Sequence, residues 1–124
     1  MVEIELFKTI IMFKFSTLFS VKPNENLINS SEFLPAANSN NGLIIDVRRL
    51  KDFKMGHLNK SIHIDFKKKS TFKNYFAKIN KKQALYIYCN SGSTSQSALK
   101  LLTNMGFLSV YKLKGGYSNW SSCV

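Results

Sequence analysis

The stretch 84-ALYIYCNSGSTSQSALKLL-102 decides how this chain folds and where its chemistry lies. Residues 84–88 form a continuous apolar run, which predicts a strand covered on both faces, as in a parallel sheet. Cys89 follows directly, and the next five residues are small, polar or glycine, which is typical of a loop. From residue 95 to residue 105, apolar residues recur three and four positions apart, which predicts a helix. The stretch therefore predicts a strand, a loop that begins with cysteine, and a helix.

The same alternation of strands and helices extends along the chain on both sides of this stretch. Asn29 and Glu32 have the spacing of a capping box, which predicts a helix over residues 30–37. Further apolar runs predict strands at residues 27–28, 43–47, 62–64 and 110–113, and a helix that contains Phe72, Tyr75, Phe76 and Ile79. Alternating strands and helices favour right-handed βα units. The expected fold class is α/β, a single domain with a central, mainly parallel five-stranded sheet flanked by helices on both faces.

Length and composition are those of an ordinary globular domain. With 124 residues, of which 44% are hydrophobic and 20% charged, the chain has room for one domain with a real core. Its two cysteines are too few for a disulfide framework or a zinc site. This cysteine usage favours a reducing compartment and hence a cytoplasmic protein.

The net charge of +11 is unevenly distributed along the chain. Residues 48–82 hold ten lysines and two arginines against two aspartates. Such a surface attracts anions, from nucleic acid to small sulfur oxyanions, although a solvated lysine-rich face is the simpler interpretation. Because the chain has no RNP-type motif, zinc finger or arginine-rich run, we expect no specific nucleic-acid partner.

Residues 1–22 form an apolar N-terminal segment that we separate from the rest of the chain. The segment is rich in Phe, Ile and Leu, but Glu3 and Glu5 oppose the basic start of a signal peptide. Lys8 and Lys14 interrupt the apolar run, which disfavours a membrane span. We expect a segment that docks on the domain, with an export signal, a membrane anchor or disorder as the open alternatives.

Cys89 lies where ligands bind in open parallel sheets, beyond the carboxyl end of a strand. The amides of residues 90–95 can turn toward its sulfur, and the start of the following helix adds partial positive charge. Such an arrangement stabilises an anion on sulfur and makes the cysteine a nucleophile. A cysteine that ends a core strand can equally be inert packing, so this pattern by itself leaves both interpretations open.

Three segments, in order along the chain, carry a resemblance to a known family. They are 46-DVRRLKDFKMGHLNKSIHIDF-66, 87-IYCNSGSTSQSALKLLTNMGF-107 and 110-VYKLKGGYSNW-120. The first resembles the opening signature of the rhodanese family, with Leu58 and Ser61 in place of the usual Ile and Ala. The second is similar to the family's active-site loop and the helix after it, and the third to its closing strand, double glycine and tryptophan. The resemblance implies a rhodanese-like domain over residues 23–124.

The resemblance also implies a chemistry, that of a thiosulfate sulfurtransferase-like enzyme. Cys89 takes up a sulfane sulfur as a persulfide, from a small sulfur-containing anion such as thiosulfate, and passes it to a thiol or to cyanide. No metal and no organic cofactor are needed. The backbone amides of the active-site loop hold the terminal sulfur, and the loop residues are Asn90, Ser91, Gly92, Ser93, Thr94 and Ser95. Structural roles around the loop are expected for Asp46, Arg48, His57, Gly115 and Gly116.

Two loop positions depart from the patterns of related enzymes. Many single-domain members carry a basic residue where this chain has Thr94, and the small neutral loop is closer to the mercaptopyruvate type of sulfurtransferase. The rival hypothesis is therefore a non-catalytic rhodanese-like module that carries sulfur or docks a protein. Rhodanese-like phosphatases and arsenate reductases place an arginine where this chain has Ser95, which disfavours phosphatase activity.

We interpret Cys123 as a spare thiol, with a resolving role as the alternative. We expect the protein to be a monomer or a weak dimer.

Overall fold

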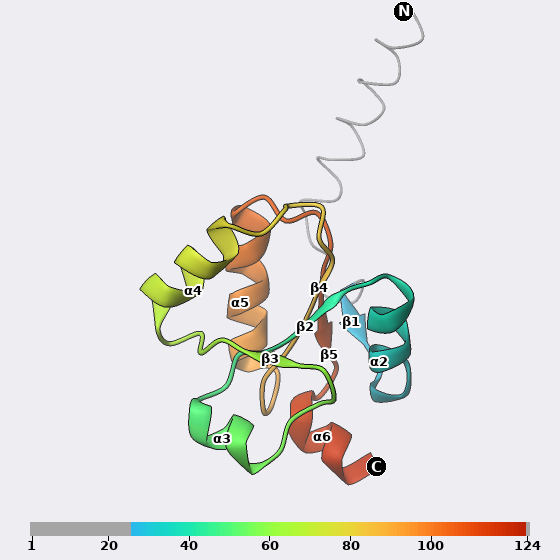
Figure 1. The fold of residues 1–124 in the computed structure, drawn as a ribbon. Helices are drawn as coiled ribbons and strands as arrows, with labels where there is room; N and C mark the ends of the chain where they lie inside the picture. The colour runs from blue at the N-terminus through green and yellow to red at the C-terminus, as the bar shows by residue number, and fades with distance from the viewer. Residues whose placement is uncertain (1–25, 124) are drawn as a thin grey trace, which may run out of the picture.

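The computed structural model describes residues 26–123, which form one five-stranded sheet with helices packed against it (Figure 1). The order across the sheet is β1-β5-β4-β2-β3, and each neighbouring pair of strands is parallel. The predicted α/β class and parallel sheet are therefore confirmed. The strands are β1 (Leu27–Ile28), β2 (Leu43–Asp46), β3 (Ile62–His63), β4 (Leu85–Tyr88) and β5 (Val110–Leu113).

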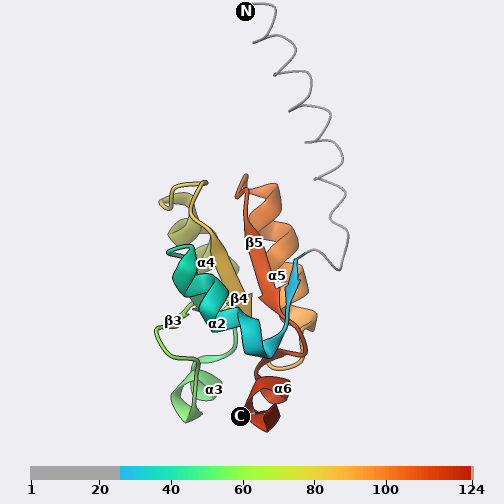
Figure 2. The same ribbon diagram turned by 90° about the vertical axis from the view of Figure 1, so that its right-hand side faces the viewer.

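Helices cover both faces of the sheet, as predicted. Figures 1 and 2 show α4 and α5 on one face and α2 on the other. The side chains of α6 pack with those of α2 in the core of the second face. The helices are α2 (Ser30–Ser39), α3 (Leu50–Met55), α4 (Lys69–Ala77), α5 (Ser93–Asn104) and α6 (Gly116–Cys123).

The sheet divides the hydrophobic core into two layers. On one side, Phe72, Phe76 and Phe107 pack with the apolar face of α5. On the other side, Phe33 packs edge-on against Tyr86, with ring centroids 5.7 Å apart. Because β4 is the middle strand, all four of its residues are buried. Burying a large apolar side chain is worth about 1.5–3 kcal/mol, so β4 is firmly fixed just before Cys89.

Two local predictions differ from the structure, and one helix was not predicted. The Asn29 side chain makes no capping hydrogen bond, and Glu32 instead donates its amide to the Asn29 carbonyl at 3.0 Å, so the capping box was wrong. The helix after Cys89 begins at Ser93, two residues earlier than predicted, because Gly92 acts as its N-cap. Helix α3 was not predicted, since it has only six residues and none of them is buried.

The carboxyl ends of the strands gather the loops that carry the candidate chemistry. Asp46 of β2 pairs with Tyr88 of β4, so the residues after each strand are neighbours. Figure 1 shows α3, α6 and the loop between β4 and α5 at this same end of the sheet. This placement confirms that Cys89 lies at the carboxyl end of the parallel sheet, which is where ligands bind in such folds.

The predictions for residues 1–22 lie outside the described residues, as does the boundary at residue 23. Docking, export and membrane anchoring of that segment therefore stay predictions. Among residues 26–123, no helix combines the length and the apolar character needed to cross a membrane.

Candidate active site

The sulfur of Cys89 is held by two backbone donors of its own loop. The Gly92 amide lies 3.1 Å from Sγ and the Ser95 amide lies 3.3 Å from it. The Ser95 hydroxyl lies 3.4 Å from Sγ and donates to the Gly92 carbonyl at 3.1 Å. Two N–H groups directed at one sulfur stabilise negative charge on it. The sequence predicted amides turned toward the sulfur, and the structure brings two of the six within hydrogen-bond distance.

Gly92 allows this arrangement because of its backbone conformation. Its φ of +108° lies in the left-handed region, which favours glycine. The chain can thereby turn from the loop directly into α5, so the first turn of this 12-residue helix points at the sulfur. The partial positive charge at a helix N-terminus adds to the effect of the two amides.

The carbonyl side of the loop is held by the start of α6. Tyr117 donates its amide to the Cys89 carbonyl at 2.7 Å, and Ser118 donates its amide to the Asn90 carbonyl at 3.1 Å. Gly116 has a φ of +67°, and a Cβ atom there would lie 2.6 Å from the Cys89 carbonyl oxygen and closer still to that of Asn90. Only glycine fits this approach, which supports the structural role predicted for Gly116.

Arg48 connects the loop to two other segments. Its Nε lies 3.0 Å from both carboxylate oxygens of Asp46, and its Nη2 lies 2.7 Å from one of them. Nη2 also donates to the Gly56 carbonyl at 2.7 Å, and Nη1 donates to Asn90 Oδ1 at 3.1 Å. The guanidinium stacks 4.3 Å from the centre of the Tyr117 ring. Burial opposes the charge of Arg48, but the hydrogen bonds and charge of Asp46 outweigh it and raise the pKa of Arg48.

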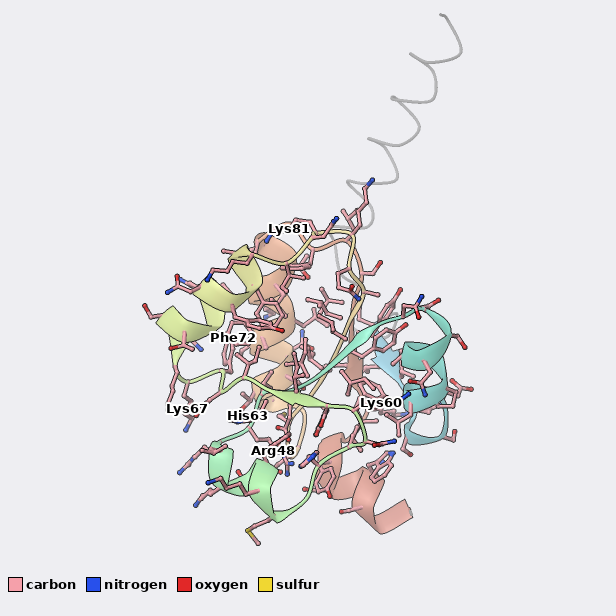
Figure 3. The ribbon with its side chains drawn as sticks, viewed as in Figure 1. Arg48, Lys60, His63, Lys67, Phe72 and Lys81 are labelled. Carbon is pink, nitrogen blue, oxygen red and sulfur yellow. The ribbon has the colours of Figure 1, made fainter. Side chains whose placement is uncertain are left out.

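A cavity of about 310 Å³ opens in front of Cys89. The loop contributes Cys89, Asn90, Ser91 and Thr94 to its lining. The other walls carry four cationic residues, Arg48, Arg49, Lys51 and Lys67, and two carboxylates, Asp52 and Asp65. In Figure 3, Arg48 and Lys67 lie toward one end of the sheet, and Lys81 lies at the other end. Because cationic groups outnumber carboxylates, the cavity favours anionic ligands.

Ser93 and His57 are among the predicted site residues that lie outside the cavity lining. Ser93 is exposed in the first turn of α5 and is not part of the lining. His57 is also exposed, with its Nδ1 2.8 Å from the Phe53 carbonyl and its ring stacked 3.8 Å from that of Phe53. This packing suits the structural role predicted for His57.

Within the described part of the chain, no three His, Cys, Asp or Glu side chains are grouped as metal ligands.

Sequence reasoning missed the individual cations around the loop. It noted the basic stretch of residues 48–82 but did not place Arg49, Lys51 or Lys67 in the lining. It also missed Lys112 of β5, whose Nζ donates to the Gly92 carbonyl at 3.1 Å. The available signal was a lysine inside the last apolar strand, where burial on both faces disfavours a charge.

Comparison with known proteins identifies the family. The model of the rhodanese-like domain matches residues 30–123. A protein named thiosulfate sulfurtransferase GlpE from Ectopseudomonas mendocina is 32% identical over 82 residues, which is 66% of this chain and 72% of that protein. The protein of the same name from Stutzerimonas stutzeri is 35% identical over 78 residues, which is 63% of this chain and 69% of that protein.

Solved structures share the fold. A rhodanese-related protein from Thermoplasma volcanium superposes with a TM-score of 0.65 at 22% identity, covering 78% of this chain and 91% of its own. A human single-domain sulfurtransferase, TSTD1, gives a TM-score of 0.65 at 17% identity, covering 78% of this chain and 96% of its own. With a family model that spans nearly the whole described chain and a fold that agrees, this protein belongs to the rhodanese family.

Proposed function

We propose that this protein is a sulfurtransferase of the rhodanese type that carries sulfur on Cys89. The Cys89 thiolate attacks the outer sulfur of a donor such as thiosulfate. The bond between the two donor sulfurs breaks, sulfite leaves with the bonding electron pair, and Cys89 becomes a persulfide anion. A thiolate or cyanide then attacks the terminal sulfur, takes it, and returns Cys89 to the thiolate. This is two-step covalent catalysis and uses no redox partner.

One observation carries the proposal: Cys89 lines an open cavity, and two amides point at its sulfur. Only 3% of the residue is exposed, which suits a nucleophile that small ligands reach through the cavity. The persulfide stays anionic, so the same donors that stabilise the thiolate stabilise the intermediate. Relatives named thiosulfate sulfurtransferase support this chemistry.

Thiosulfate is the donor we propose, because the cavity walls compensate for the neutral loop. No residue from Asn90 to Ser95 is charged, so the loop has no cation with which to bind a dianion. Arg49, Lys51 and Lys67 place positive charge in the lining from outside the loop.

The test is an intact-mass measurement after incubation with thiosulfate, followed by cyanide. The Cys123→Ser variant is used, so that Cys89 is the one remaining thiol. We expect a gain of one sulfur atom and its release as thiocyanate over many turnovers. A sulfur gain with negligible release would make the protein a carrier, and no gain from thiosulfate or mercaptopyruvate would contradict sulfur transfer altogether.

We predict that the double variant Lys51→Gln/Lys67→Gln raises KM for thiosulfate by about 10-fold at low salt, with little change in kcat. The two lysines line the cavity and attract the dianion before it reacts. Since the Debye length shrinks to about 3 Å at 1 M salt, the difference from wild type should nearly vanish there. Initial rates of thiocyanate formation at both salt concentrations measure the effect.

The control is Lys78→Gln/Lys82→Gln, which removes the same charge from exposed lysines between α4 and β4, outside the cavity lining. Its KM should stay within about 2-fold of wild type. An equal rise in KM in both double variants would show that net charge, not the cavity, recruits thiosulfate.

We predict that Gly116→Ala lowers sulfur-transfer activity by about 100-fold, because a small displacement of reacting groups has effects of this size. The new Cβ collides with the carbonyls of Cys89 and Asn90 and must move the loop. The control is Gly106→Ala, which also places alanine at positive φ but meets only Lys81 Cγ at 3.9 Å. Both variants should lose stability in urea denaturation, and only Gly116→Ala should lose kcat/KM beyond about 3-fold. Equal activity of the two variants would rule out a tight fit between α6 and the loop.

A further inference from the structure

Lys112 places a positive charge against the active-site loop, outside the lining of the cavity. It lies in β5, the strand next to β4, and its Nζ donates to the Gly92 carbonyl at 3.1 Å. Gly92 is the residue whose amide points at the Cys89 sulfur. Lys112 is absent from the cavity lining, so it does not meet the donor or the acceptor directly.

The surroundings of Lys112 disfavour a cation. The side chain is partly buried, and burial lowers the pKa of Lys112. It also lies at the N-terminal end of α5, where the helix dipole repels positive charge. Within residues 26–123, the one ion pair within 4 Å joins Asp46 and Arg48, so no carboxylate of this part of the chain compensates Lys112.

Negative charge on the Cys89 sulfur acts against the effect of burial, because it favours the charged form of Lys112 and so raises the pKa of Lys112. A negative charge on the Cys89 sulfur and the positive charge of Lys112 therefore attract each other.

We propose that Lys112 is a positioning residue for the Cys89 nucleophile: its ammonium fixes Gly92 through the carbonyl and balances the negative charge on the sulfur from outside the cavity lining. It supplies from the neighbouring strand the cation that the loop sequence lacks. The proposal rests on Cys89 as the nucleophile, but its test does not require sulfur transfer.

The other charged groups near the loop are accounted for. Arg48 is paired with Asp46, and α6 and the first two turns of α5 contain no charged residue. Burial raises the pKa of Tyr88, which keeps this phenol neutral. Further titratable or charged groups face the cavity or pack beside Arg48: Arg49, Lys51, Asp52, Asp65, Lys67 and Tyr117. Lys114, directly after β5, is exposed. These groups are identical in the variants compared below, so a difference between variants reports on Lys112.

The test compares Lys112→Met and Lys112→Arg in the Cys123→Ser background, by the rate of Cys89 alkylation with neutral iodoacetamide from pH 5 to pH 10. We expect Lys112→Met to react about 5- to 10-fold more slowly at pH 7, with its pH profile moved upward by about one unit, and to match the parent protein at high pH. Lys112→Arg should keep most of the reactivity at pH 7, because it keeps the charge. We expect kcat/KM with thiosulfate to decrease in the same order, from the parent protein to Lys112→Arg to Lys112→Met.

Lys100→Met is the control for charge alone. Lys100 is exposed on α5, eight residues after Gly92 and so about 12 Å along the helix, beyond the Debye length in physiological salt. Its alkylation profile should match that of the parent protein.

Two outcomes would overturn the proposal. If Lys112→Met lowers the alkylation rate by the same factor at every pH, Lys112 only holds the loop in place and its charge does not act on Cys89. If the alkylation profile of Lys112→Met is unchanged, Lys112 has no role at the site. Urea denaturation separates these cases from loss of structure. Because removing a desolvated cation relieves an unfavourable burial, the midpoint for Lys112→Met should be equal to or above that of the parent protein. If Cys89 proves unable to carry sulfur although this alkylation pattern holds, the proposed function fails and the coupling of Lys112 to Cys89 stands.

Discussion

Replacing Cys89 by serine is expected to reduce sulfur transfer to below about 10⁻⁴ of the wild-type rate, the scale on which removal of a nucleophile acts in covalent catalysis. A hydroxyl keeps the size of the site and its hydrogen bonds but is not deprotonated near neutral pH. The two amides can stabilise an anion, yet they cannot remove a proton. The chain's two histidines are held elsewhere, since His57 bonds the Phe53 carbonyl and His63 bonds the Arg48 carbonyl. Thiocyanate formation and the intact mass after incubation with thiosulfate measure the result.

The control for Cys89→Ser is Cys123→Ser, which makes the same chemical change at the second cysteine. It should keep activity within about 2-fold and still gain one sulfur. Turnover that survived in Cys89→Ser would remove Cys89 from the mechanism. Loss of turnover in Cys123→Ser would instead show that the second thiol takes part in the reaction, as in the resolving role considered from the sequence.

Replacing Arg48 by methionine is expected to lower the free energy of unfolding by about 3–5 kcal/mol, the usual result of breaking a buried ion pair by removing one partner. Asp46 is fully buried, and Arg48 supplies three of its hydrogen bonds from the side chain. Without the guanidinium, the carboxylate keeps the Arg48 amide at 2.9 Å but has no opposite charge. The Gly56 carbonyl and Asn90 Oδ1 lose a donor as well. Urea denaturation followed by circular dichroism measures the loss.

Two further variants separate the ion pair from the loss of a large side chain. Arg49→Met removes an exposed neighbouring arginine and should change the unfolding free energy by less than about 0.5 kcal/mol. Asp46→Asn combined with Arg48→Met removes the unpaired charge and should recover at least half of the loss. If the double variant is as unstable as Arg48→Met alone, the packing of Arg48 on Tyr117 matters more than its charge.

The parallel sheet and the position of Cys89 could be predicted because both depend on local patterns. A continuous apolar run such as that of β4 indicates burial on both faces wherever it occurs, and a cysteine directly after it must lie at the carboxyl end of the strand. Helix α3 escaped prediction because it is short and none of its residues is buried. The expected cap at Asn29 failed because spacing alone does not direct a side chain toward the helix amides.

The sequence by itself determined the α/β fold, the loop that begins at Cys89 and the neutral character of the side chains of that loop. Only the tertiary structure decided which distant charges surround that loop. The order of strands places β4 between β2 and β5, and so brings Arg48 to Asn90 and Lys112 to Gly92, two residues of the loop that follows Cys89. Periodicity reports how deeply each segment is buried, whereas the neighbours of a segment depend on how all the strands pack together. For this reason the position of Cys89 could be predicted from its own strand, while the cations around it could not.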